Sequence, residues 1–173
     1  MPHIDDTLAA LQARFGEAIE QVVNFRGETT VVVRRADLIE ALRYLKETPE
    51  LGFAYLANQT AYDDWPQEPR FNVVYQLRNL VRVSNLRLKV RVPGDDPVLP
   101  TATGLFSNAN WHERELYDMF GLSFTGHPDL RRLLMPADWE GHPLRKDYPL
   151  GYEEVEFTFN FDAIEAKKPY AKE

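Results

Sequence analysis

Residues 85–92, with the sequence NLRLKVRV, decide the fold. Apolar Leu and Val side chains at positions 86, 88, 90 and 92 alternate with the cations Arg87, Lys89 and Arg91. A period of two residues is typical of a β-strand, because successive side chains point to opposite faces of a sheet. The stretch therefore predicts a strand with one buried face and one basic outer face.

Other strand patterns lie between this stretch and the N-terminus. Apolar residues alternate along residues 71–79, with an interruption of the polar side at Val74. Two β-branched runs flank a turn that contains Gly27, which is typical of a hairpin. A weaker pattern precedes the proline-containing loop at residues 63–69. Strands are therefore expected at residues 21–25, 29–34, 53–62, 71–79 and 85–92.

Three further stretches have apolar residues spaced for helices. The first carries them at positions 8, 11, 15 and 19, close to the helical period of about 3.6 residues. Pro49 ends the second helix, and Gly121 is expected as the C-cap of the third. Helices are expected from a capping Asp5 or Asp6 to residue 19, at residues 36–48 and, with a break near residues 108–110, at residues 103–120. The order of elements predicts an α+β domain at residues 1–123, in which helices pack against a mostly antiparallel sheet.

Residues 124–173 follow a different pattern. Prolines interrupt them, yet eight of these fifty residues are aromatic, a larger share than the 12% of the whole chain. Because disordered tails are poor in aromatic residues, we expect an extended arm that becomes ordered by wrapping a partner subunit. Folding back onto its own domain is the alternative that the sequence leaves open. Alternation at residues 154–161 predicts a strand within the arm. The expected anchors of the arm are Trp139, Tyr152, Phe157, Phe159 and Phe161.

The composition excludes several kinds of chemistry. The 173 residues include 20 Lys and Arg, 27 Asp and Glu and no Cys, with a net charge of −7. Without Cys, the chain forms no disulfide, no zinc–thiolate site, no cysteine-ligated cluster and no thiol nucleophile. No apolar run approaches the roughly 18 residues of a membrane-spanning helix, and residues 1–6 do not resemble a signal peptide. We therefore expect a soluble intracellular protein, and the acidic balance disfavours nucleic acid as a partner.

A cluster of potential metal ligands lies in the third predicted helix. Residues 111–121, WHERELYDMFG, bring His112, Glu113, Glu115 and Asp118 together within two turns. A zincin-type helix requires a second His four residues after His112, where this chain has leucine. We therefore expect no metal at this cluster.

The charges of that helix are expected to stabilise the fold instead. Arg114 and Asp118 lie four residues apart, which favours an ion pair on one helix face. Leu116, Met119 and Phe120 are expected to face the core, and the remaining charges to meet solvent or a partner.

A short imperfect repeat follows the helix, with GHPDLRR at residues 126–132 and GHPLRKD at residues 141–147. Each copy combines a flexible Gly, a His before a stiff Pro and a following basic pair, a combination that suits docking. The histidines, His127 and His142, suit acid–base catalysis, but no nucleophile motif or glycine-rich phosphate-binding loop accompanies them. A hydrolase is therefore disfavoured.

The segment at residues 69–94 contains six cations and no acidic residue. An RNA-binding sheet is one alternative for such a segment. However, Phe71 and Tyr75 share a strand face with aliphatic residues, so we expect them in the core, and the glycine–aromatic motif of RNA-binding sheets is missing. A contact surface for an acidic partner is favoured.

The region from residue 111 to residue 150 resembles a known family. The matching elements are ERE at 113–115, DMF at 118–120, His127, Arg131, LL at 133–134, LMP at 134–136 and GHPLRKDYPL at 141–150. They are similar to the signature of the thirty-kilodalton subunit, designated C, of respiratory complex I, the proton-pumping NADH:quinone oxidoreductase. Equivalent chains of membrane-bound hydrogenases and of ferredoxin-linked quinone reductases are alternatives that the sequence leaves open.

The resemblance implies a non-catalytic subunit of the peripheral arm, on the cytoplasmic side of the cell inner membrane. Such a chain reaches the membrane only through the complex. Its implied partners are the quinone-site subunit, which the family designates D and which forms much of the quinone site, and other peripheral-arm subunits. The C-terminal arm of the family wraps the quinone-site subunit. The chain itself is expected to bind no cofactor, while other subunits hold FMN, iron–sulfur clusters, NADH and quinone.

The polar residues of the motif are expected to form ion pairs and hydrogen bonds within this module or across to the quinone-site subunit. None is expected to be catalytic, to bind a cofactor or to ligate a metal. The expected interface residues are Glu113, Arg114, Glu115, Asp118, His127, Pro128, Asp129, Arg131, Arg132, His142, Pro143, Arg145, Lys146, Asp147 and Tyr148.

Overall fold

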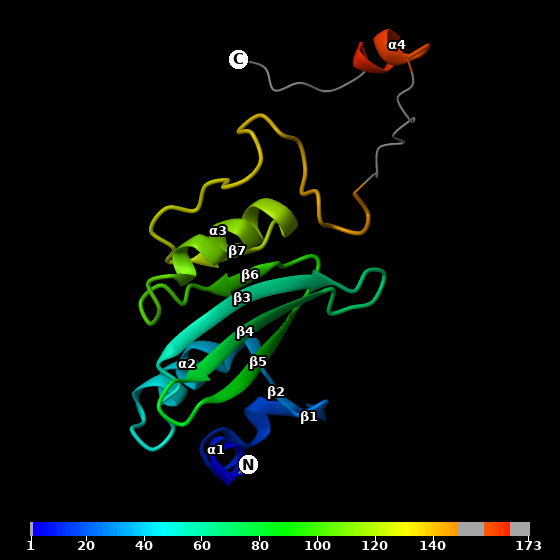
Figure 1. Ribbon diagram of the computed structural model, residues 1–173. Helices are drawn as coiled ribbons and strands as arrows, with labels where there is room; N and C mark the ends of the chain where they lie inside the picture. The colour runs from blue at the N-terminus through cyan, green and yellow to red at the C-terminus, as the bar shows by residue number, and fades with distance from the viewer. Residues whose placement is uncertain (1, 149–157, 167–173) are drawn as a thin grey trace.

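A five-stranded mixed sheet forms the centre of the protein (Figure 1). The computed structural model describes residues 2–148 and 158–166. In space the strands follow the order β1-β2-β5-β4-β3, and every neighbouring pair is antiparallel except β2 and β5. The expected α+β class with a mostly antiparallel sheet is confirmed. The strands are β1 (Ile19–Phe25), β2 (Glu28–Val33), β3 (Tyr55–Asp63), β4 (Phe71–Asn79) and β5 (Ser84–Val92), each within two residues of its predicted bounds.

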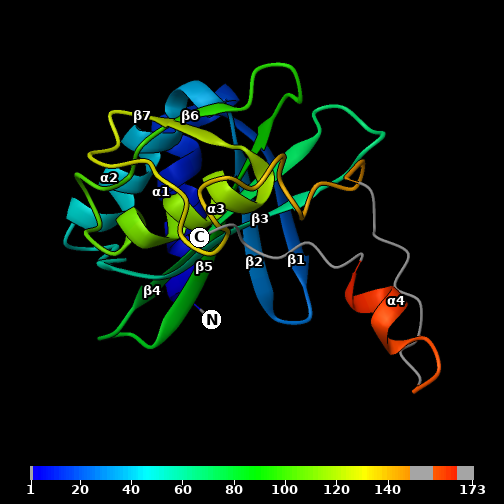
Figure 2. The same cartoon turned by 90° about the horizontal axis from the view of Figure 1, so that it is seen from above.

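The helices α1 (Pro2–Phe15) and α2 (Leu38–Glu47) cover one face of this sheet (Figures 1 and 2). Short 3-10 turns, η1 (Gly16–Ala18) and η2 (Arg35–Asp37), join them to the neighbouring strands. The first helix ends earlier than predicted, because Gly16 has a φ of +46°, outside the right-handed helical region. Ile19, which was expected on the helix, therefore begins β1.

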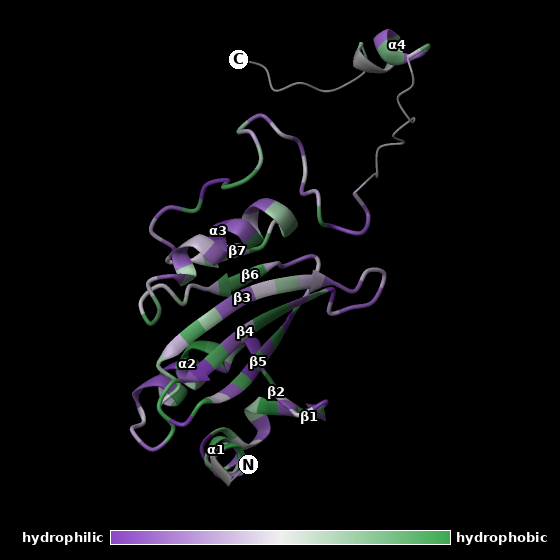
Figure 3. Ribbon diagram, viewed as in Figure 1, coloured by the Kyte–Doolittle hydropathy of each residue, from purple (hydrophilic) through white to green (hydrophobic). Residues whose placement is uncertain are grey.

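The buried face of the sheet follows the alternation in the sequence. Phe71, Tyr75, Leu86 and Leu88 are fully buried, while their neighbours along the strands, apart from Val74, carry polar groups to the other face. Figure 3 shows this alternation of hydrophobic and hydrophilic residues along β4 and β5. Each fully buried Leu or Phe contributes roughly 1.5–3 kcal/mol. The prediction that Phe71 and Tyr75 belong to the core is confirmed.

The third helix, α3 (Ala109–Phe120), lies beside the edge strand β3 (Figure 1). It starts later than predicted, because residues 102–106 form turns in which the N–H groups of Leu105 and Phe106 donate to Ala102 O. The amide of Asn108 donates to Leu56 O at 2.8 Å and so joins the start of α3 to β3. A two-stranded parallel sheet, β6 (Val98–Pro100) and β7 (Ser123–Thr125), flanks α3.

The segment after β7 folds back over α3 and contains no further strand or helix up to residue 148 (Figure 1). Residues 126–148 therefore fold back onto their own domain, which is the alternative that the sequence had left open to an arm that wraps a partner subunit. The short helix α4 (Phe161–Glu165) comes next among the described residues. Residues 158–160 form a turn before it, so the strand predicted at residues 154–161 is wrong from residue 158 onward. Its first part, with the predicted anchor Phe157, lies outside the described residues, and so does the predicted anchor Tyr152.

Candidate functional site

The candidate site is the contact between α3 and residues 127–148, which we call the return segment. The last turn of α3 prepares this contact. Gly121 has a φ of +72°, and its N–H donates to Tyr117 O at 2.9 Å, which confirms the predicted C-cap. A Cβ at Gly121 would lie 2.5 Å from Nη2 of Arg145 and 2.6 Å from the His142 ring. Glycine therefore permits both the left-handed turn and the close approach of the return segment.

Asp118 is the central acceptor of the contact, and its side chain is fully buried. Its Oδ2 accepts three backbone N–H groups, from Leu133 at 3.0 Å, Leu134 at 2.7 Å and Met135 at 2.9 Å. Its Oδ1 accepts Nη1 of Arg132 at 2.8 Å. Burial by itself raises the pKa of the Asp118 carboxyl, but these four donors outweigh it and hold the pKa below its usual value.

Arg132 links Asp118 to the middle of the return segment. Its Nη2 donates to Trp139 O at 2.9 Å and to Gly141 O at 3.0 Å. The predicted ion pair of Arg114 with Asp118 is therefore wrong, because Arg132 occupies the carboxylate. Arg114 instead donates to two backbone carbonyls of the return segment, Arg131 O at 3.2 Å and Arg132 O at 3.3 Å.

Arg70 forms a second buried centre, between the β3–β4 loop and the end of the return segment. Its guanidinium donates to both carboxylate oxygens of Asp63, at 2.9 and 2.7 Å, and to both of Asp147, at 3.0 and 2.5 Å. Oδ2 of Asp63 also accepts the backbone N–H of Lys146 at 2.8 Å. Burial alone would raise the pKa of Asp63, but Arg70 and the backbone N–H groups of Lys146 and Trp65 lower it to about 2. The two aspartates in turn raise the pKa of Arg70.

The last part of the return segment, residues 142–148, covers the end of α3. Nε of Arg145 donates to Phe120 O at 2.6 Å, and the guanidinium lies over the Phe71 ring at 5.4 Å. His142 contacts Asp118 O through Nδ1 at 3.0 Å. Because a carbonyl only accepts, Nδ1 carries the hydrogen, and burial lowers the pKa of this histidine. The phenol of Tyr148 donates to Glu140 O at 3.2 Å.

Glu113 lies deeper than predicted. We expected it to meet solvent or a partner, but it is fully buried, and it accepts Thr101 Oγ1 at 2.5 Å and the Ala102 N–H at 2.7 Å. Burial raises the pKa of its carboxyl. The His127 side chain, also fully buried, places Nε2 at 3.9 Å from the carboxylate and 3.2 Å from Asn110 O. The Asp129 N–H donates to Nδ1 of His127 at 3.0 Å, so Nε2 carries the hydrogen.

The other predicted interface residues lie at the surface or close to it. Asp129 and Arg131 form an exposed ion pair at 2.9 Å, which contributes little to stability. Glu115 is exposed, and Pro128 and Pro143 flank the two histidines at the outer side of the return segment. Trp139 is partly buried and stacks on the Tyr148 ring at 6.5 Å, whereas Phe159 and Phe161 are exposed.

Sequence reasoning missed Asp63 and the role of Arg70. Arg70 lies 77 residues from Asp147, so no local spacing indicated the pair. Among the described residues, no group of three or more His, Asp and Glu side chains is arranged to hold a metal ion. No helix within residues 2–148 and 158–166 is long and apolar enough to span a bilayer. The buried charges bind backbone groups and one another, so their effect is to fix the return segment on α3 and β4.

Comparison with known proteins gives this fold a class. The family model described as "Respiratory-chain NADH dehydrogenase, 30 Kd subunit" matches residues 31–154. The C subunit of NADH-quinone oxidoreductase from Roseiflexus sp. (strain RS-1) is 52% identical over 96% of this chain and 95% of its own length. That of Herpetosiphon aurantiacus is 48% identical over 85% of this chain and 86% of its own length.

Two solved structures agree with the fold. The trypsin-resistant fragment (1-134) of Nqo5 superposes with a TM-score of 0.65 at 35% identity, over 74% of this chain and 99% of the fragment. A chain of the membrane-bound sulfane sulfur reductase, an archaeal respiratory membrane complex, gives a TM-score of 0.70 at 20% identity, over 98% of this chain and 95% of that one, which shows the fold alone. The protein is one subunit of a multi-subunit respiratory oxidoreductase. It belongs to the family of the thirty-kilodalton, or C, subunits of NADH-quinone oxidoreductases.

Proposed function

We propose that this chain is a non-catalytic subunit of the peripheral arm of NADH:quinone oxidoreductase, and that it holds the quinone-site subunit and neighbouring iron–sulfur subunits in place. The observation that carries the proposal is the return segment itself. Two buried carboxylate–guanidinium centres, at Asp118 and at Arg70, fix its backbone from both ends. A segment without helix or strand that is held this tightly presents a preorganised surface, which lowers the entropy lost on binding.

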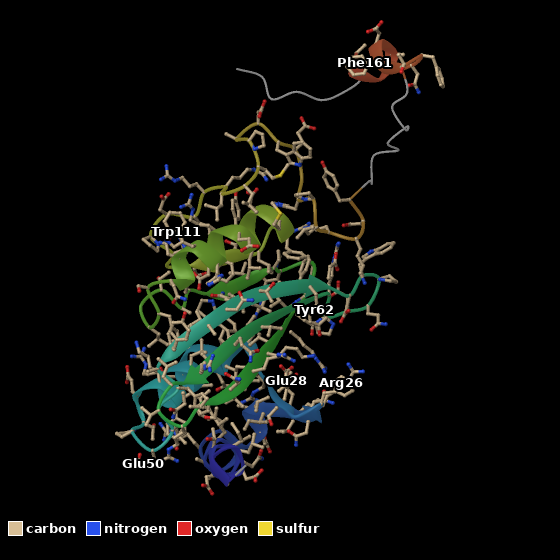
Figure 4. All side chains as sticks on the ribbon, viewed as in Figure 1. Arg26, Glu28, Glu50, Tyr62, Trp111 and Phe161 are labelled. Atoms are coloured by element: carbon tan, nitrogen blue, oxygen red, sulfur yellow. The ribbon has the colours of Figure 1, made fainter. Side chains whose placement is uncertain are left out.

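The outer side of that surface carries apolar side chains. Leu134 is 62% exposed and Leu144 is 55% exposed, on the return segment, and Trp111 on α3 is 59% exposed. Figure 4 shows Trp111 on the outside of α3. Exposed apolar groups beside desolvated ion pairs are typical of contacts between subunits, where the apolar groups supply affinity and the polar groups supply specificity.

The redox cofactors belong to other chains in this proposal. FMN, iron–sulfur clusters, NADH and quinone are held by neighbouring subunits, and this chain supplies the geometry between them. The chain then lies on the cytoplasmic side of the inner membrane and meets the membrane only through the complex. The predicted wrapping of the quinone-site subunit by the C-terminal arm is part of this proposal, and it falls largely outside the described residues.

Purification of a tagged chain from solubilised membranes, followed by mass spectrometry, tests the proposal. We expect the quinone-site subunit and the NADH-oxidising subunits to copurify with it. Hydrogenase or ferredoxin-linked subunits in their place would assign the chain to a related complex. RNA recovered without membrane proteins, or turnover of a small molecule by the chain alone, would refute the proposal.

A pair of matched variants tests where the contact lies. Leu134→Asp places a charge on the return segment, whereas Leu80→Asp places one at the β4–β5 turn, where the leucine is 64% exposed. We expect Leu134→Asp to lower copurification of the quinone-site subunit by at least about tenfold, since burying an unpaired carboxylate is costly. Leu80→Asp should leave copurification of the quinone-site subunit within about twofold of the wild-type level. Equal effects of the two variants would contradict the assignment of the return segment as the contact.

A further inference from the structure

The sheet face opposite α1 and α2 is uncovered in the described part of the chain. Strand register aligns one row of side chains across all five strands: Val23, Thr30, Arg87, Gln76 and Asn58. These five, together with Thr60, Tyr62, Val74 and Lys89, line a hollow of about 440 Å³. Glu28, which pairs with Arg87, and Tyr62, which accepts a hydrogen bond from Lys89, lie on the same face (Figure 4). The hollow is therefore a feature of the whole sheet and lies apart from the return segment.

Positive charge collects on this face, although the whole chain has a net charge of −7. Arg87 is paired with Glu28 at 2.6 Å. Lys89 donates to the Tyr62 hydroxyl at 3.3 Å, and Arg91 donates to the Gln21 amide oxygen at 3.1 Å, so the observed partners of these two cations are neutral. The face therefore carries cations whose charge is not balanced by these contacts.

We propose that this face docks an acidic segment of a neighbouring protein chain in the complex, an inference that rests on the function proposed above. Carboxylates are the groups that Lys89 and Arg91 would pair with, and the Asn, Gln and Thr side chains around them suit hydrogen bonds to backbone or carboxylate. Val23 and Val74 line the hollow as well and supply apolar contact. Hydrogen bonds already hold Arg87, Lys89 and Arg91 across the strands, which reduces the ordering cost of binding.

A nucleic acid fits this face less well than a protein segment. Of the nine side chains that line the hollow, Tyr62 is the one aromatic group, whereas single-stranded RNA is bound by successive stacking platforms. A polyanion would also approach against the negative charge of the rest of the chain. A short acidic peptide segment meets the local positive field without extending far beyond it.

Photo-crosslinking in the assembled complex identifies what covers the face. Thr60, which is exposed within the hollow, is replaced by the photoreactive residue p-benzoylphenylalanine, and membranes are irradiated before mass spectrometry. We expect an adduct with another subunit, in a peptide with more Asp and Glu than Lys and Arg. An adduct with residues 149–173 of this chain, with nucleic acid or with a peptide lacking acidic excess would overturn the inference. So would the absence of any adduct when the chain is present in the complex.

Variants that change the charge of this face test whether electrostatic attraction holds the acidic segment. Lys89→Glu with Arg91→Glu should lower incorporation of the chain into the complex at least about tenfold, and Lys89→Gln with Arg91→Gln should give an intermediate loss. The matched control is Arg14→Glu with Arg43→Glu, on α1 and α2. Its incorporation into the complex should stay within about twofold of that of the wild-type chain. Equal loss for the glutamine and glutamate variants, or for the control, would overturn the electrostatic explanation. Absence of the wild-type chain from any respiratory complex would instead refute the proposed function.

Discussion

Replacement of Asp118 by asparagine tests how the return segment is held. The variant keeps the shape of the side chain but removes its charge. Its amide also brings N–H donors against the backbone N–H groups and the Arg132 guanidinium, which are donors themselves. In the wild-type protein, the Asp118 carboxylate accepts hydrogen bonds from three backbone N–H groups and from Nη1 of Arg132. Breaking one member of a buried ion pair costs about 3–5 kcal/mol. Arg132 keeps its hydrogen bonds to Trp139 O and Gly141 O in the variant, so its charge is not left without partners. We therefore expect the contact to lose a smaller free energy, about 2–3 kcal/mol.

Hydrogen exchange of backbone amides measures this loss where it arises. If the return segment opens locally, exchange at Leu133, Leu134 and Met135 should accelerate about 30- to 140-fold, since each 1.4 kcal/mol is tenfold. Glu115→Gln, on the same helix but exposed, is the matched control and should change the free energy of unfolding by less than about 0.5 kcal/mol. Unchanged protection of the three amides in Asp118→Asn would refute the assignment of Asp118 as the anchor.

Three further predictions concern the same contact. Arg145→Ala should impair assembly of the complex rather than a chemical step, as read on native gels; an assembled complex with intact cofactors but no turnover would contradict this. The pKa of Asp63 is about 2 when folded and 3.8 in the reference state, so its pairing stabilises the fold fully above about pH 4 and is lost as the pH falls toward 2. Acid titration should show about 2 kcal/mol of stability lost in that window, and Asp63→Asn should abolish that part of the pH dependence. Gly121→Ala should cost at least about 1–2 kcal/mol in urea unfolding, because of its positive φ and the close Arg145 and His142 atoms, whereas Gly104→Ala, with open space around it, should be nearly neutral.

Local geometry explains why the sheet could be predicted. The side chains of residues 85–92 alternate because a strand places neighbours on opposite faces, and that rule needs no knowledge of the rest of the chain. Gly121 was recognisable as a helix end for the same reason, since the left-handed turn is a property of a few residues. The family could be recognised because the residues between 111 and 150 resemble the signature of a known family, and such a resemblance can be read from the sequence itself. The basic outer face of β5 was also predicted and is present as a half-exposed row.

Tertiary structure alone decided which charges are paired and which are buried. Helical spacing favoured Arg114 as the partner of Asp118, yet Arg132 takes that place, because the return segment crosses this face of α3 and brings its own guanidinium. The bidentate pairs of Arg70 join residues separated by 7 and by 77 positions. Glu113 looked like a surface charge and is fully buried. Backbone periodicity follows from neighbouring residues, whereas the partner and pKa of a charge depend on what removes water from it, and distant segments of the chain do that.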